Sequence, residues 1–200
     1  MKKKASVLIT AISALLLLNV WLSRSSFLRI HFIDVGAGDA ILIQYRGESV
    51  LIDSGTLLNG YGIAEYLKRH KAERIKYLIL THPDLDHVSG VFFILPKLKV
   101  QQIFDNGQSL PAGHPYDWYG QLVRSRQHYS VLKRGDSLRL KDMRLDILWP
   151  EDTKEGSFNA NSLAIRLSLN NFSAFFAADL DRSAEQGLLS RGDKLKSDLI

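Results

Sequence analysis

The sequence predicts an α/β protein whose core consists of two β-sheets flanked by helices. Apolar runs rich in β-branched and aromatic residues recur along the chain and are separated by polar turn residues. Segments with the spacing of amphipathic helices lie between several of these runs. The composition, with 46% hydrophobic and 24% charged residues, is that of a folded domain and excludes disordered and multi-spanning membrane classes.

Strands dominate both halves of the chain, and helices lie between them. The expected elements are, in chain order, strands at 27–34, 40–45 and 49–53, a helix at 63–71, a strand at 75–80, a helix at 86–95 stopped by Pro96, a strand at 100–104, a helix at 116–129, strands at 139–140, 144–148, 163–169 and 173–178, and a helix at 183–190. Short turns between the first three strands predict antiparallel pairing. This alternation favours two packed sheets with helices outside them.

Residues 1–26 form a separate segment, which we expect to be a signal anchor or signal peptide before one domain at 27–200. Three lysines at 2–4 precede an apolar run at 5–22, as in targeting segments. The run just reaches the length of a membrane span, and the nearest small-residue pair for cleavage flanks Arg24. We favour an uncleaved anchor with an extracytoplasmic domain, because basic residues before a span stay in the cytoplasm. Secretion after cleavage is the alternative.

The charge and the absence of cysteine limit the possible functions. The net charge of +5 comes from the first thirty residues, and the other 21 basic residues balance the 21 acidic ones. Global charge therefore does not indicate nucleic-acid binding. Because the chain contains no cysteine, it has no disulfide or thiol nucleophile, and any metal must be held by His, Asp or Glu.

The segment THPDLDH at 81–87 carries the clearest chemical signal. Directly after the apolar run YLIL, it places four metal-capable side chains within six residues: His82, Asp84, Asp86 and His87. Crowding carboxylates and imidazoles at the end of a buried strand costs solvation and repulsion, which bound cations relieve. We therefore expect a metal site here, the alternative being a solvated polar turn.

Two further aspartates follow apolar strands. Asp53 ends the run SVLID, and Asp179 follows AFFAA, so both could reach one cleft at the strand ends. Asp179 is the best candidate for a further ligand. Its alternative role is the N-cap of the helix that follows.

The residues HPDLDH resemble the HxHxDH signature of the metallo-β-lactamase superfamily, with Asp84 in place of the second His. The ordered motifs HFIDVGAGDAILIQ, SVLIDSG, THPDLDHVSG, NANSLAIRL and FAADLD also resemble the hydrolase-like domain of the ComEC family of competence proteins, over about residues 29–200. This resemblance implies a metallo-β-lactamase-type αββα four-layer sandwich with a dinuclear metal cleft.

The resemblance also implies roles for individual residues. His82 and Asp84 would bind one ion, Asp86 and His87 the second, and Asp179 would bridge them. Asp53 would orient the metal turn. Two divalent ions can activate water and clamp an electrophilic centre, so we expect Asp84 and Asp86 to serve catalysis. An Asp in place of a His favours Mn²⁺ or Mg²⁺, and Zn²⁺ remains open.

The sequence departs from the family pattern in three ways. Ala37 stands where the family has Gln, and Asn161 lies about where the third-motif His belongs. The chain stops at KLKSDLI, where the family would present its HHGS motif, so the domain is expected to be truncated at its C-terminus. We expect the reading frame to continue past Ile200 into a His-containing turn.

The expected function is metal-dependent hydrolysis of a phosphodiester, with DNA as the first substrate, because the resemblance is to proteins of DNA uptake. The alternatives are an ester or amide hydrolase, including lactam and lactone rings, and a non-catalytic binding module. The aromatic loop HPYDWY at 114–119 would either stack bases or cover a sheet end.

Overall fold

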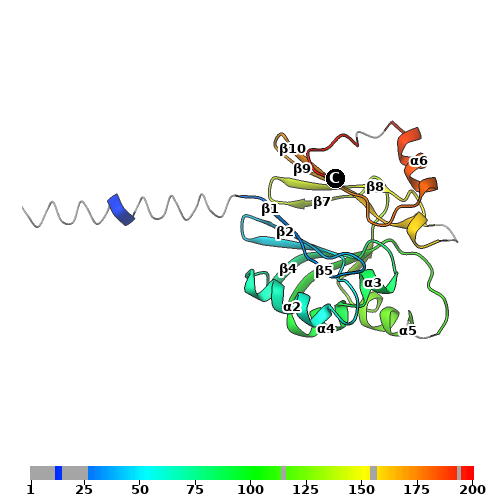
Figure 1. The fold of residues 1–200 in the computed structure, drawn as a ribbon, viewed down its shortest axis with the longest axis horizontal. Coiled ribbons are helices and arrows are strands. Elements are labelled where there is room, and N and C mark those ends of the chain that lie inside the picture. The colour runs from blue at the N-terminus through cyan, green and yellow to red at the C-terminus, as the bar shows by residue number, and fades with distance from the viewer. Residues whose placement is uncertain (1–11, 15–26, 114–115, 154–156, 193–194) are drawn as a thin grey trace, which may run out of the picture.

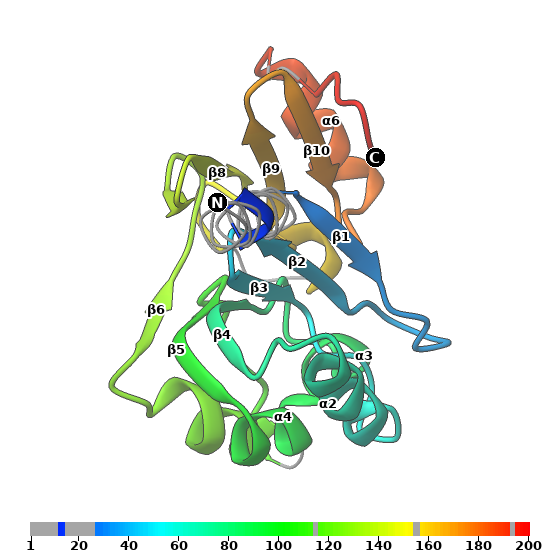
Figure 2. The same ribbon diagram turned by 90° about the vertical axis from the view of Figure 1, so that its left-hand side faces the viewer.

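The fold consists of four layers, as Figure 1 shows for the computed structural model. The structure describes residues 12–14, 27–113, 116–153, 157–192 and 195–200. Helices cover one face of a six-stranded sheet, a four-stranded sheet packs on its other face, and a single helix covers the far side (Figures 1 and 2). The predicted αββα sandwich is confirmed.

The first sheet is mixed. Its strands lie in the order β1 (Arg29–Phe32), β2 (Ile41–Tyr45), β3 (Glu48–Ile52), β4 (Arg74–Ile79), β5 (Lys99–Asp105) and β6 (Tyr129–Val131). The first three pair antiparallel, as predicted, and β3 to β6 are parallel. The carboxyl ends of β3, β4 and β5 therefore meet at one edge, where parallel sheets commonly place ligand sites.

The second sheet is antiparallel. Its strands lie in the order β10 (Phe172–Phe176), β9 (Ala164–Leu169), β8 (Met143–Trp149) and β7 (Ser137–Leu140). The amide of Leu163, just before β9, donates to the Thr81 carbonyl at 2.9 Å, which joins the two sheets beside the first sheet's carboxyl edge. At the other margin, Leu199 forms a parallel bridge with Ala174 of β10.

Helices close both outer faces. On the first sheet these helices are α2 (Gly60–Arg69), α3 (Leu85–Val88), α4 (Val91–Lys97) and α5 (Tyr116–Tyr119). Helix α5 continues into a π-helical turn (Gly120–Arg124). On the second sheet the helix is α6 (Arg182–Ser190). A short 3₁₀ turn spans Asn159–Asn161. Leu188 of α6 is buried near Phe175, so this helix is anchored to the second sheet.

Alternating side chains of the first sheet build two apolar layers. Leu51 and Leu78 face the helices, whereas Val50, Ile52 and Ile79 face the second sheet. All five are at most 1% exposed. Burying each such side chain stabilises the fold by about 1.5–3 kcal/mol. The motif at 81–87 thus follows a strand that is fixed from both faces.

Two predicted helices differ from the structure. The segment 86–95 is two helices, because the chain turns at Gly90, where an added Cβ would lie 1.8 Å from the Ser54 carbonyl oxygen. Pro96 does not stop the second helix, which ends at Lys97. The predicted helix at 116–129 ends early, and Tyr129 begins β6 because its hydroxyl donates to buried Asp105 at 2.6 Å.

The predicted anchor at 1–26 lies outside the described residues except for positions 12–14. Within the described ranges, no helix has both the length and the apolar character needed to cross a bilayer.

Leu145→Ala should destabilise the protein strongly, because Leu145 is fully buried between the sheets. The expected loss is about 2–5 kcal/mol, and urea denaturation followed by circular dichroism measures it. Leu189→Ala is the control, since Leu189 is 68% exposed on α6 and should change stability by about 0.5 kcal/mol or less. Equal losses in the two variants would contradict this account of the core.

Candidate metal centre

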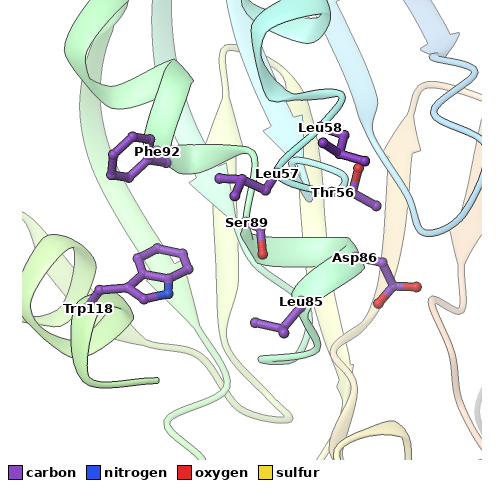
Figure 3. Close-up of a pocket in the computed structure, with 8 residues that line it drawn as sticks. All are labelled: Thr56, Leu57, Leu58, Leu85, Asp86, Ser89, Phe92 and Trp118. Atoms are coloured by element: carbon purple, nitrogen blue, oxygen red, sulfur yellow. The ribbon is translucent and has the colours of Figure 1, made fainter. Parts of the chain in front are cut away.

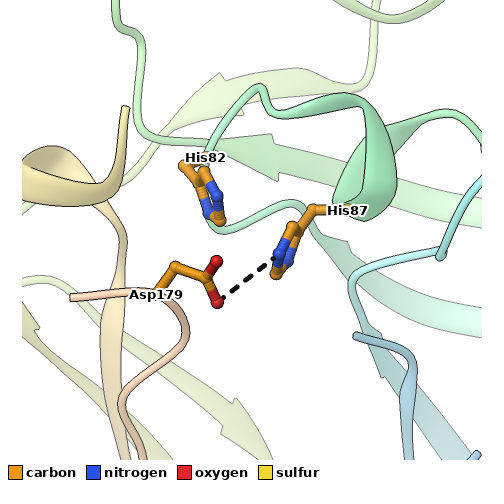
Figure 4. Close-up of side chains that lie close together, drawn as sticks. All are labelled: His82, His87 and Asp179. Carbon is orange, nitrogen blue, oxygen red and sulfur yellow. Dashed lines mark ion pairs between the residues drawn. The ribbon is translucent and has the colours of Figure 1, made fainter. Parts of the chain in front are cut away.

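The predicted site residues, the orienting Asp53 among them, gather where β3, β4 and β10 end. Asp53 follows β3, His82 lies shortly after β4, and His87 lies on α3. Asp179 follows β10 of the second sheet and points toward the two histidines (Figure 4). The site therefore draws its side chains from both sheets.

Asp53 is the buried anchor of this site. Its carboxylate accepts hydrogen bonds from the Thr81 amide and the Thr81 hydroxyl, both at 2.7 Å, and from His87 Nδ1 at 3.0 Å. Burial raises the pKa of Asp53, and these three donors counter that effect by stabilising the carboxylate. Asp53 adopts a left-handed conformation, with φ of 57°, which non-glycine residues occupy at a cost.

The hydrogen bonds to Asp53 set the tautomers of both histidines. A carboxylate only accepts, so His87 Nδ1 carries a proton. The Thr81 hydroxyl gives its proton to Asp53 and therefore accepts from His82 Nδ1, at 3.0 Å. Both rings are thus held by hydrogen bonds at Nδ1, and the Nε2 atom of each ring takes no part in these bonds.

The two Nε2 atoms are buried, and neither has a hydrogen-bond partner among the described residues. The ring centroids of His82 and His87 are 4.1 Å apart. Asp179 Oδ1 lies 3.6 Å from His87 Nε2, and one ligand atom from each of the three residues lies within 4.8 Å of the others (Figure 4). Two buried imidazole nitrogens without hydrogen-bond partners, facing a carboxylate, fit a divalent cation.

Asp179 does not cap α6. Asp181 is the N-cap, and its Oδ1 accepts from the Ala184 amide at 3.0 Å. The alternative role predicted for Asp179 is therefore wrong. Ala178 has a left-handed conformation, with φ of 49°, and this turn after β10 leaves the Asp179 side chain directed at the histidines.

The two histidines have opposite protonation preferences. Burial, followed by the nearby charge of His87, lowers the pKa of His82 to about 3, so its ring is neutral. Burial also disfavours the charged form of His87, but the hydrogen bond and charge of Asp53, with the charges of Asp179 and Asp86, raise its pKa to about 9. A cation at His87 Nε2 must therefore displace a proton at neutral pH.

Asp84 and Asp86 lie beside this group rather than in it. Asp84 Oδ2 is 3.4 Å from His82 Nε2, and Asp84 precedes α3 without capping it through its side chain. Burial and then the charge of Asp86 raise the pKa of Asp84. Asp86 lines a groove next to the site (Figure 3). The structure thus gathers His82, His87 and Asp179 within 4.8 Å of one another, places Asp84 in contact with His82, and leaves Asp86 in the lining of the groove.

Asp39 was not predicted from the sequence, yet it reaches the site. Potential ligand atoms of Asp39, Asp53 and His87 lie within 4.8 Å of one another. Burial raises the pKa of Asp39. The loop that carries it packs on the metal turn, since a Cβ on Gly38 would lie 1.9 Å from the Asp86 carbonyl oxygen. The only sequence signal was its place in the motif DVGAGDA.

Asn161 lies in the loop before β9. Its side-chain amide donates to the Ser157 carbonyl at 3.2 Å, and its own carbonyl accepts from Asn106 at 2.9 Å. Two residues later, Leu163 is bonded to Thr81. Asn161 therefore belongs to the loop that borders the metal turn.

The comparisons with known proteins agree with this geometry. The family model of the metallo-β-lactamase superfamily matches residues 33–197. The chain belongs to this superfamily. Proteins of this fold typically bind divalent metal ions such as zinc, and the His and Asp side chains described above are the candidate ligands here.

The curated relatives include competence proteins. ComE operon protein 3 of Bacillus subtilis is 26% identical over 214 residues, an alignment that covers 94% of this chain and 26% of that protein. Competence protein ComA of Neisseria gonorrhoeae is 24% identical, with 84% of this chain and 22% of that protein covered. The chain thus spans about a quarter of the length of these relatives.

Solved structures share the fold. A subclass B3 metallo-β-lactamase from a soil metagenome library has a TM-score of 0.58 at 15% identity, covering 86% of this chain and 75% of that one. A subclass B3 enzyme of Bradyrhizobium japonicum has a TM-score of 0.56 at 14% identity, covering 86% and 73%. At these identities the likeness establishes the fold alone.

Asp53→Asn should weaken divalent-metal binding by about 10–100-fold, because an amide cannot accept all three hydrogen bonds that orient Thr81 and His87. Isothermal titration with Zn²⁺ and Mn²⁺ measures this loss. Asp142→Asn is the control, because that carboxylate forms a half-exposed ion pair with Arg46, outside the metal centre, and its loss should leave metal affinity unchanged. Unchanged affinity in the Asp53 variant would contradict its orienting role.

Proposed function

We propose that this protein is a metal-dependent hydrolase that uses two divalent ions to cleave phosphodiesters, with DNA as the first substrate. The observation that carries the proposal is the pair of buried Nε2 atoms on His82 and His87, which have no hydrogen-bond partner among the described residues and face the Asp179 carboxylate. Similarity to competence proteins supports nucleic acid as substrate, and the number of carboxylates at the site suits oxygen-preferring metals.

In this proposal His82 and Asp84 hold one ion, and His87 and Asp86 hold the other. Asp179 is shared, because it comes from the opposite sheet and faces both histidines. Asp39 adds a carboxylate on the His87 side. Zn²⁺ and Mn²⁺ are the first candidates, and Mg²⁺ is a third.

Bound divalent ions at such a site lower the pKa of water and offset the negative charge of a phosphoryl group. The protein's own residues fix the positions of the groups that would hold these ions. Asp53 and Thr81 hold both imidazoles through Nδ1, so ion binding would require the loss of the His87 Nε2 proton but no turning of either ring. Asp84 Oδ2 lies 3.4 Å from His82 Nε2, so its carboxylate is placed to hold an ion together with that imidazole.

Asp179→Asn and Asp181→Asn form a matched pair that tests this function. Asp179→Asn should lower metal affinity by about tenfold or more and abolish hydrolysis of DNA and bis-p-nitrophenyl phosphate. Asp181→Asn should retain both properties, because Asn caps a helix nearly as well as Asp. Elemental analysis and the two hydrolysis assays measure the outcome.

Other results would contradict the proposal. Hydrolysis of nitrocefin without hydrolysis of bis-p-nitrophenyl phosphate would assign the site to lactam chemistry. A purified protein that binds no metal and cleaves neither substrate would be a binding module of the same fold. Equal loss in both aspartate variants would show that Asp179 has no special role.

We also propose that the domain at 27–200 functions outside the cytoplasm, tethered by the segment at 1–26. The lysines at 2–4 before the apolar run support this orientation. A reporter fused after Gly47 should be active only if it is an extracytoplasmic enzyme such as alkaline phosphatase. Strong activity of a cytoplasmic reporter at the same position would overturn the topology.

A further inference from the structure

An apolar groove of about 740 Å³ opens beside the metal centre. It is lined by Thr56, Leu57, Leu58, Leu85, Asp86, Ser89, Phe92 and Trp118. In Figure 3, Trp118 and Phe92 lie at one end and Asp86 at the other, with Leu57, Leu85 and Ser89 between them. The volume is within the range of about 300–1,000 Å³ typical of ligand sites. The groove is thus an extension of the candidate active site.

The lining exposes an unusual amount of apolar surface. Leu58 is 92% exposed, and Leu57, Leu85 and Phe92 are between 40% and 55% exposed. A contiguous patch of this kind next to polar catalytic groups is typical of a binding surface. No Lys or Arg is among the eight lining residues, so the groove suits an uncharged group rather than a phosphate.

Hydrogen bonds of the residues that follow Trp118 fix the turn that carries it. The neighbouring Tyr119 is buried and donates through its hydroxyl to Asp105 at 3.0 Å. Arg124 donates to the same carboxylate at 2.8 Å, which fixes the π-helical turn after α5. The backbone at Trp118 is therefore fixed, and its ring lies edge-on to that of Tyr119 with the centroids 6.1 Å apart, so a ligand that stacks on Trp118 loses less affinity to ordering.

We infer that this groove binds an unpaired nucleobase next to the scissile phosphate, which makes single-stranded nucleic acid the preferred substrate. The inference rests on the proposed phosphodiesterase function. Aromatic side chains stack any base, and the leucines cover its flat face. A base inside a duplex is already stacked and paired, so it would have to leave the helix to enter.

The test measures binding to the metal-loaded protein, and phosphorothioate linkages in both probes slow cleavage. The probes are a fluorescein-labelled oligothymidylate of about twelve nucleotides and the same oligomer with tetrahydrofuran abasic residues, followed by fluorescence anisotropy. The wild-type protein should bind the thymidylate about tenfold more tightly than the abasic oligomer. Trp118→Ala should remove this preference, and Trp118→Phe should keep most of it.

Exposed leucines provide a matched control that does not threaten folding. Leu58→Ser should weaken thymidylate binding several-fold, whereas Leu189→Ser on α6 should leave it unchanged. Equal affinity of the wild type for the two oligomers would overturn the inference. A wild-type dimer that Leu58→Ser converts to a monomer in sedimentation, with no base preference, would instead assign the groove to self-association and also overturn it.

Hydrolysis of bis-p-nitrophenyl phosphate by the same wild-type preparation separates two failures. Hydrolysis without a base preference would mean that the groove inference is wrong and the proposed function stands. A base preference without any hydrolysis would support the groove as a binding site and contradict the catalytic proposal.

Discussion

The candidate metal centre depends on one buried carboxylate. Asp53 is fully buried, and its three hydrogen bonds tie the end of β3 to the metal turn after β4 and to helix α3. The same bonds decide which nitrogen of each histidine faces the site. A hydrophobic residue in this place would fill the space but leave Thr81 and His87 without their acceptor. Both the shape of the turn and its chemistry therefore follow from Asp53.

Close backbone contacts hold the surrounding loops in place. Gly90 packs against the Ser54 carbonyl, and Ser54 in turn donates to the His87 carbonyl through its amide and hydroxyl, at 2.7 and 2.9 Å. Gly38 packs in the same way against the Asp86 carbonyl. A side chain at either glycine would force these loops apart. The site is thus built from tightly stacked turns that lie on a rigid sheet.

Local patterns predicted much of the fold and of the site, and long-range contacts explain what they missed. Every strand except β6, and the His82–His87 turn, could be predicted because periodicity and spacing are local properties. Asp39 could not be found this way, since it reaches His87 only because its loop folds over Asp86. Tyr129 was placed in a helix, and its bond to Asp105, 24 residues earlier, makes it part of a strand instead.

The origin of Asp179 has a mechanical consequence. His82 and His87 follow strand β4 of the first sheet and Asp179 follows β10 of the second, so an ion held by either histidine together with Asp179 would span the seam of the sandwich. Metal–ligand bonds tolerate only about 0.2 Å of variation. Thermal motion that separates the sheets would stretch such bonds, and the ion would resist it. The cation proposed for catalysis would therefore also stiffen the joint between the two halves of the protein.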